Sequence, residues 1–113
     1  MGKLKDLFSP SATKERKAKI ELAKKLNGKP LKCVCERKNG IEEIIARDGA
    51  IVMDNGKIII YGGQDIVFRA DFMSVNAGEL LSLEGIVVQG IDEMSGEERS
   101  IVAYYKYWRN VSE

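Results

Sequence analysis

Histidine is absent from the 113-residue sequence. Its absence removes the usual general base near neutral pH, the commonest metal ligand, and the base that activates Ser and Cys nucleophiles. The two glycine-rich phosphate-binding motifs, G-x-x-x-x-G-K-[ST] and G-x-G-x-x-G, are also missing. We therefore expect a protein that is not an enzyme, takes no cofactor and has no small-molecule substrate.

Long apolar runs are missing as well. Runs such as IIIY at 58–61 are far shorter than the roughly 20 residues that span a bilayer. The first residues, MGKLKDLFSP, are too few and too charged for a secretory signal. Their three large apolar side chains bury little area, which argues against peripheral membrane contact. We expect a cytoplasmic protein with reduced thiols.

Cysteine occurs only twice, in the stretch LKCVCERKNG at 31–40. On a strand, alternation places Cys33 and Cys35 on one face with Leu31, and Val34 on the other. Two such Cα atoms lie about 6.5 Å apart, too far for a relaxed disulfide. Structural zinc needs four ligands, which only a dimer sharing two thiol pairs would supply. The pattern therefore predicts two buried thiols that act as small hydrophobic residues, and no metal site.

The net charge of +1 hides an asymmetry, because residues 1–38 carry +8 and residues 39–113 carry −7. A basic segment before an acidic body has three explanations. It packs on that body or on a neighbouring molecule, it is a solvated face, or it contacts phosphates or a membrane surface.

Residues 9–28 carry the signals of a helix. Ser9 is a capping residue, Pro10 suits the first turn, and Asn27-Gly28 provides a left-handed stop before Pro30. The apolar stripe is weak, so the helix is expected to lie on a surface. One side of the helix carries four cations that are candidate phosphate contacts: Lys14, Lys17, Lys24 and Lys25. We expect residues 1–30 to form a basic helical arm.

From residue 31 the pattern becomes that of a β domain, expected over 31–113. Turn signals such as Asn39-Gly40 and Asn55-Gly56 recur about every eight residues, between short runs rich in Ile, Val, Phe and Tyr. The sequence predicts a mainly β (α+β) fold, a small antiparallel barrel or strongly bent sheet of six or seven strands with the helix as its cover. The expected strands are 31–38, 41–47, 50–54, 57–61, 65–72, 85–92 and 99–108. Segment 73–84 is read either as a loop with one helical turn or as an early start of the next strand.

The stretch IVAYYKYWRN at 101–110 contains the only Trp and three of the four Tyr. Alternation assigns Ile101, Ala103, Tyr105 and Tyr107 to a core face. The other face holds a candidate binding patch: Tyr104, Lys106 and Trp108, with Arg109 close by. Such a patch suits base stacking with single-stranded nucleic acid, or a protein partner, or burial under the helix or a second subunit.

Carboxylates offer little chemistry in this sequence. The acidic stretch DEMSGEE at 92–98 does not have the ligand spacing of a calcium loop, so we expect a solvated hairpin tip. Two functions remain. The first is a non-enzymatic interaction module with protein contacts, which include self-association. The alternative is an accessory nucleic-acid-binding protein that uses the basic helix and the aromatic strand.

Overall fold

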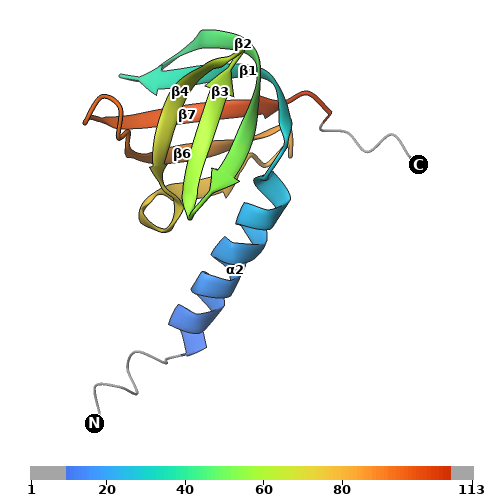
Figure 1. The fold of residues 1–113 in the computed structure, drawn as a ribbon, viewed down its shortest axis with the longest axis vertical. Helices are drawn as coiled ribbons and strands as arrows, with labels where there is room; N and C mark the ends of the chain where they lie inside the picture. The colour runs from blue at the N-terminus through green and yellow to red at the C-terminus, as the bar shows by residue number, and fades with distance from the viewer. Residues whose placement is uncertain (1–9, 108–113) are drawn as a thin grey trace.

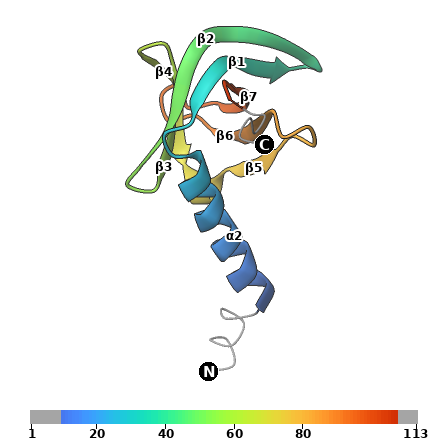
Figure 2. The same cartoon turned by 90° about the vertical axis from the view of Figure 1, so that its right-hand side faces the viewer.

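A computed structural model describes residues 10–107, which form one helix followed by seven antiparallel strands curled into a half-barrel (Figures 1 and 2). The predicted mainly β fold, a strongly bent sheet behind an N-terminal helix, is therefore confirmed. The sheet order is β4-β3-β2-β1-β7-β6-β5. The elements are α2 (Pro10–Leu26), β1 (Pro30–Lys38), β2 (Ile41–Asp54), β3 (Lys57–Gly62), β4 (Asp65–Asp71), η1 (Phe72–Ser74), β5 (Asn76–Glu79), β6 (Gly85–Ile91) and β7 (Glu98–Tyr105).

β2 is one continuous strand of 14 residues. The prediction of two strands, 41–47 and 50–54, separated by a turn at Asp48-Gly49, is wrong. The first part of β2 pairs with β1 and the last part with β3. β2 is therefore the strand on which the sheet bends, and the Asp-Gly signal marks the bend and not a reversal of the chain.

Close backbone approach explains the glycine at this bend. A Cβ atom on Gly49 would lie 1.8 Å from the carbonyl oxygen of Tyr61 on β3. Asp48, just before it, has a positive φ of 58°, a conformation that Asp tolerates better than most residues. The Asn39-Gly40 and Asn55-Gly56 pairs, in contrast, have positive φ at both residues and form the tight hairpin turns that the sequence predicts.

Segment 73–84 fits the first of the two predictions, a loop with one helical turn, and adds a separate strand; the prediction of an early start of the next strand is wrong, because β6 begins at Gly85. It begins within the short 3₁₀ turn η1, forms β5 over Asn76–Glu79, and then runs as a loop to β6. β5 pairs only with β6, so it is an edge strand of the sheet. Its four residues are too short to give a recognisable period-two pattern.

The main core lies on the inner face of the curled sheet. Its buried side chains come from every strand except β5, and from the last turn of α2 through Leu26. The core residues are Leu26, Leu31, Val34, Ile51, Ile58, Ile60, Phe68, Ala70, Phe72, Val75, Ile86, Val88, Ile101, Ala103 and Tyr105.

The C-terminal half of α2 covers the β5 edge of the sheet. Lys19 Nζ donates a hydrogen bond to the Val75 carbonyl and lies 5.2 Å from the centre of the Phe72 ring. Burial lowers the pKa of Lys19, against the opposing effect of Asp71. Lys25 pairs with Glu79 of β5 at 2.9 Å. The helix thus packs on the acidic body, while its first half projects away from the sheet (Figures 1 and 2).

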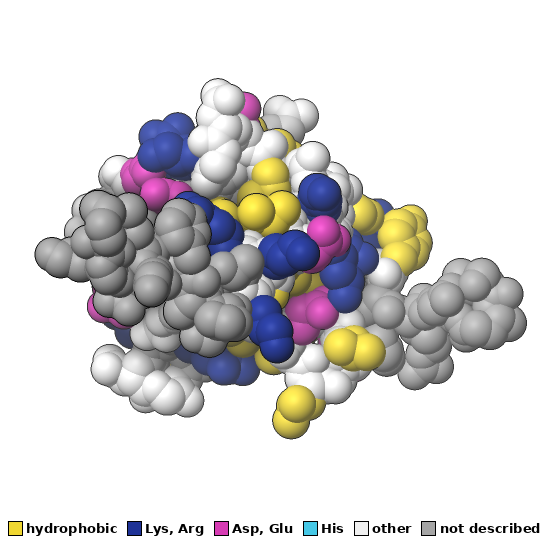
Figure 3. Space-filling view, turned by 90° about the horizontal axis from the view of Figure 1, so that it is seen from below, with side chains coloured by type: hydrophobic (Ala, Val, Ile, Leu, Met, Phe, Trp, Pro, Cys, Tyr) yellow, Lys and Arg dark blue, Asp and Glu magenta, His cyan; other side chains and the backbone are white. Residues whose placement is uncertain are grey.

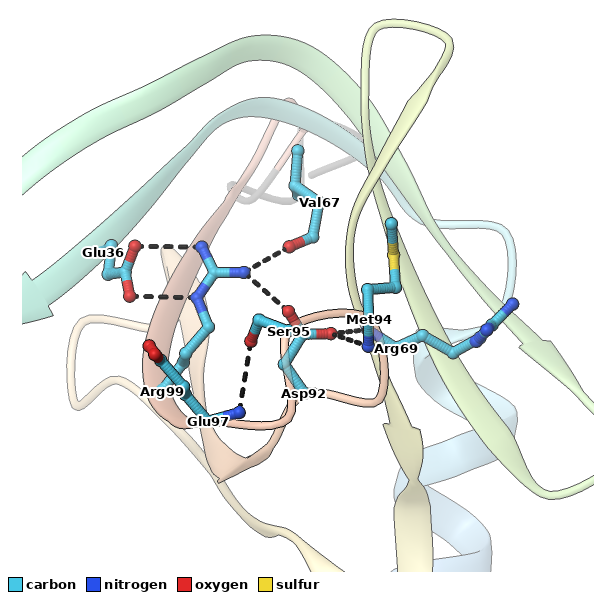
Figure 4. A network of polar contacts seen from close by, with 8 residues as sticks. All are labelled: Glu36, Val67, Arg69, Asp92, Met94, Ser95, Glu97 and Arg99. Atoms are coloured by element: carbon cyan, nitrogen blue, oxygen red, sulfur yellow. Dashed lines mark hydrogen bonds and ion pairs between the residues drawn. The ribbon is translucent and has the colours of Figure 1, made fainter.

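The opposite edge, β4, is covered by the loop between β6 and β7. Asp92 of this loop accepts a hydrogen bond from the Arg69 amide at 3.2 Å, and the Arg69 carbonyl accepts one from the Glu93 amide at 2.8 Å. Arg99 of β7 donates to the Val67 carbonyl at 2.8 Å (Figure 4). These contacts occupy backbone groups that an exposed edge strand would offer to another chain.

Arg99 joins three parts of the sheet through charge. Its guanidinium binds both carboxylate oxygens of Glu36 on β1, at 2.9 and 3.0 Å, and Asp92 Oδ2 at 2.8 Å (Figure 4). The Asp92 side chain is only 2% exposed. Burial alone would raise the pKa of Asp92, but hydrogen bonds from the Met94 amide, Arg99 and the Arg69 amide outweigh it and lower that pKa. A bidentate pair of this kind is both strong and geometrically specific.

No helix within residues 10–107 has the length and apolar character needed to cross a membrane.

Removing the guanidinium should destabilise the fold strongly, because it leaves the Asp92 carboxylate buried without its cation. We expect Arg99→Leu to lower the free energy of unfolding by about 3 kcal/mol, measured by urea denaturation. Arg37→Leu, which breaks the more exposed pair with Glu42, is the matched control and should cost under about 1 kcal/mol. Equal effects of the two variants would contradict the role given to Arg99.

Acid should weaken the same network. Hydrogen bonding by Arg99 lowers the pKa of Glu36, and the pKa of Asp92 is lowered as described above. Their stabilisation is therefore complete above the ordinary values of 4.5 and 3.8, and is lost as the pH falls through the lowered folded-state values. Denaturation midpoints measured from pH 7 downward should stay level to about pH 5 and then fall. Asp92→Asn should flatten that fall, whereas Glu97→Gln, at an exposed position, should not.

Candidate functional site

A second apolar cluster lies on the outer face of the sheet, separate from the main core. Cys33, Cys35 and Val102 form its buried centre. The side chains that pack against them are partly exposed: Leu80, Val87 and Tyr104. In a curled sheet with its core inside, the outer face is normally the solvated one. An apolar outer face therefore marks this surface as unusual.

The prediction that both thiols are buried is confirmed, with Cys33 7% and Cys35 3% exposed. The predicted assignment of faces is partly wrong, because Leu31 and Val34 both belong to the inner core while the thiols belong to the outer cluster. The reason lies in an irregularity of β1. Its register against β7 shifts between Leu31 and Cys33, where Lys32 is the extra residue, and Cys33, Val34 and Cys35 then alternate regularly. A bulge of this kind breaks simple alternation.

Beside this cluster lies a hollow of about 470 Å³, which we call the outer groove. Its lining comes from β1, β2, β7 and the residue before β6: Lys32, Cys33, Cys35, Glu42, Ile44, Arg47, Glu84 and Tyr104. The strand pairing explains this assembly, since Cys33 lies between Arg47 and Tyr104, and Cys35 lies opposite Ile44.

Tyr104 and Glu42 form a fixed polar pair at the groove. The Tyr104 hydroxyl donates to Glu42 Oε2 at 2.6 Å, and Arg37 Nε donates to Glu42 Oε1 at 2.9 Å. The hydrogen bond to Glu42 is the main reason that the pKa of Tyr104 is raised to about 12. The same hydrogen bond, with that from Arg37, lowers the pKa of Glu42. Glu42 therefore remains a carboxylate at neutral pH, with both oxygens occupied.

The two thiols lie side by side at the groove floor. Burial is the main reason that the pKa of Cys35 is raised to about 11, and the neighbouring Cys33 and Glu42 contribute in the same direction. Because only the thiolate is a strong nucleophile, this environment does not activate Cys35 for covalent catalysis.

The loop between β5 and β6 places large apolar side chains in solvent next to the groove. Leu80 packs on the outer cluster and Glu84 lines the groove, so the loop begins and ends there. Between them, Leu81 is fully exposed and Leu83 is 58% exposed. Leu83 also has a φ of +66°, which is rare for a bulky side chain. A strained, exposed leucine is a feature that stability alone does not explain.

The predicted aromatic patch is only partly described by the structure. Tyr104 lies on the outer face as predicted, at the groove. Lys106 follows the end of β7, is exposed, and has its Nζ 6.0 Å from the centre of the Tyr107 ring. Tyr107, assigned to the core face by the alternation, is 70% exposed because β7 ends at Tyr105. Trp108 and Arg109 lie outside the described residues, so their part in the patch stays a prediction.

The four predicted helix lysines are exposed, but they differ in their contacts. Lys24 lies 3.9 Å from Glu21, and Lys25 is paired with β5. Lys14 and Lys17 belong to the first half of α2, the half that projects away from the sheet (Figure 1). Seen from below, the Lys and Arg side chains are interspersed with acidic and apolar ones and form no continuous basic field (Figure 3).

The acidic stretch 92–98 is not entirely the solvated tip that the sequence predicts. Residues 93–98 are exposed, but Asp92 is buried and paired with Arg99. Nothing in the spacing of this stretch distinguishes Asp92 from its neighbours, because its partners come from β4 and β7. Within the described range, no three Cys, Asp or Glu side chains converge as metal ligands would.

Comparison of the chain with models of known protein families, with curated proteins and with solved structures finds no match.

The environment of Cys35 should make it slow to alkylate. A pKa raised from 9.0 to about 11 leaves about a hundredfold less thiolate at neutral pH. We expect iodoacetamide labelling of Cys35 in the native protein, followed by site-resolved mass spectrometry, to be at least that much slower than in urea. Glu42→Gln should speed it, because it removes a neighbouring negative charge. Equal labelling rates in the native and urea-unfolded protein would contradict this description of the site.

Proposed function

We propose that this protein is a non-enzymatic interaction module whose contact surface is the outer groove together with the leucines of the β5–β6 loop. The main support for this proposal is that the exposed Leu81 and Leu83 lie beside an open hollow with a largely apolar floor. Exposed apolar groups beside a shaped hollow are typical of protein contact surfaces. The raised pKa of Cys35 and the hydrogen bonds that hold both oxygens of Glu42 do not support a catalytic use of these two residues.

The partner we propose is a second copy of this chain. A two-fold axis brings the same surface of each copy together, so a projection and a hollow on one surface can fill each other reciprocally. Leu81 supplies the projection, and the floor formed by Cys33, Cys35 and Ile44 supplies the hollow. Burying two exposed leucines from each copy would contribute several kcal/mol of hydrophobic free energy, before the cost of association is subtracted.

The charges at the groove suit such a self-contact. Within the described part of the chain, Lys32, Arg47 and Glu84 form no ion pair, although all three line the groove. A two-fold arrangement can therefore place the cations of one copy against the Glu84 of the other. Mixed signs on one surface favour self-association, whereas a single sign would oppose it.

Nucleic-acid binding by the helix is the alternative, and the contacts support it less. Lys25 is engaged by the body, Lys24 lies beside Glu21, and the face in Figure 3 mixes cations with carboxylates. Lys14 and Lys17 on the projecting half remain as phosphate contacts. Retention on single-stranded RNA at low salt, lost steeply as salt rises, would favour this alternative over the self-contact.

Light scattering should report twice the monomer mass for the native chain at high micromolar concentration. Leu81→Glu and Ile44→Glu should each weaken the dimer about tenfold or more, because each puts a charge into the apolar contact. Met94→Glu is the matched control, since Met94 is about as exposed as Ile44 but belongs to the β6–β7 loop. Circular dichroism of each variant checks that the sheet is intact. A native chain that is monomeric throughout the concentration range would overturn the second copy as the partner.

A further inference from the structure

The thiols of Cys33 and Cys35 are potential metal ligands, and neither the packing of the sheet nor the proposed self-contact requires that property. Two thiols are adjacent on one strand face, at the floor of an open groove, in a protein that has no histidine to compete for metal. From this geometry we propose that Cys33 and Cys35 form a binding site for one soft, two-coordinate cation, of which Cu(I) is the representative. Both ligands come from a single chain, so the site does not depend on the proposed dimer.

The spacing of the thiols fits two-coordinate binding. Cα atoms two residues apart along a strand are separated by about 6.6 Å. A metal between two sulfurs, each bonded at about 2.3 Å, needs a sulfur–sulfur separation of about 4.6 Å, which converging side chains can reach. Both thiols line the outer groove and belong to one buried cluster, so they lie on the same face of the sheet. That Cα separation is close to the upper limit for a disulfide, whose Cα atoms are most often about 5.5 to 6 Å apart.

The ligand type and number select the class of metal. Thiolates are soft ligands that favour Cu(I), Zn²⁺ and iron–sulfur clusters. Tetrahedral zinc sites need four ligands, and no group of three potential ligands forms within residues 10–107. Glu42 lies near the thiols, but both of its oxygens are already hydrogen-bonded, to Tyr104 and Arg37. Two thiolates alone suffice for a monovalent d¹⁰ cation, and that leaves Cu(I).

The charge of the complex is balanced by its surroundings. Binding forms two metal–sulfur bonds and releases two protons to solvent, with no change of oxidation state. Two thiolates and one Cu(I) carry a net charge of −1 at the groove floor. Lys32 and Arg47 line the same groove, so cationic side chains lie beside that charge. The groove also gives the ion a path to thiols that are otherwise almost completely buried.

Cu(I) itself is the probe, supplied anaerobically from a coloured Cu(I) chelator to the reduced full-length chain. We expect transfer of about one Cu(I) per chain, and a rise in melting temperature that grows with copper concentration. Cys33→Ala and Cys35→Ala should each weaken binding about a hundredfold, and the double variant should not take copper from the chelator. Alanine keeps a small apolar side chain at each site, and circular dichroism confirms the fold. Leu81→Glu, which is expected to weaken the dimer and does not line the groove, should leave the copper stoichiometry unchanged.

Three results would overturn the proposal. The first is no transfer of copper to the native chain, and the second is binding that persists in the double alanine variant, which would point to methionines. The third is tighter binding of zinc, at one ion per two chains with doubled mass, which would indicate a four-thiolate site shared by two copies. These results are distinct from a failure of the proposed dimer, which would appear as a monomeric mass in the absence of metal.

Discussion

The ion pair between Arg99 and Asp92 is the contact that holds the β6–β7 loop over the edge strand β4. A seven-stranded sheet that curls only halfway leaves two edge strands with unpaired backbone groups. One edge is covered by α2. The other is covered by the β6–β7 loop, which is held in place because Asp92 lies between the Arg99 guanidinium and the Arg69 amide. The same guanidinium binds Glu36 on β1, so the loop, the edge strand and the middle of the sheet are fixed together.

The bend in β2 and the bulge in β1 explain why the molecule has two apolar clusters. The bend at Gly49 wraps the sheet around the main core, and the bulge between Leu31 and Cys33 turns the thiols away from that core. The outer cluster is covered only in part, by Leu80 and Tyr104, and the outer groove remains open beside it. The proposed contact surface is thus a result of strand irregularity, because a regular β1 would have placed Cys33 and Cys35 with Leu31.

Much of the fold is predictable from short stretches of sequence, because turn residues and the alternation of apolar residues act locally. Asn-Gly pairs determine tight turns, and alternating apolar residues such as Phe68 and Ala70 determine which face is buried. Local signals fail where a contact from a distant strand decides the outcome. Asp48-Gly49 has the composition of a turn, but the approach of Tyr61 makes it a bend. Asp92 looks like any acidic loop residue, and only Arg99 and β4 give it a buried role.

The candidate site is less predictable than the fold for the same reason. The sequence identifies Tyr104 and the thiols as residues of interest, and it predicts correctly that the thiols are buried. It does not indicate that Glu42 would bind Tyr104 from 62 residues away, nor that Leu81 and Leu83 would stand in solvent beside the groove. Those relations arise from the strand order, which no single segment of the chain determines.

The separation of the thiols from the main core has a consequence for chemical damage. Oxidation adds bulk and polarity to sulfur, and in a central core that change disrupts the packing of a whole domain. Here the sulfurs lie in the smaller cluster, while Phe68, Ile101 and their neighbours pack on the opposite side of the sheet. A sulfenic or sulfinic group at Cys33 or Cys35 would therefore alter the outer surface first. Oxidation at these positions would leave the packing of the inner core unchanged, and with it the strand order that the core supports.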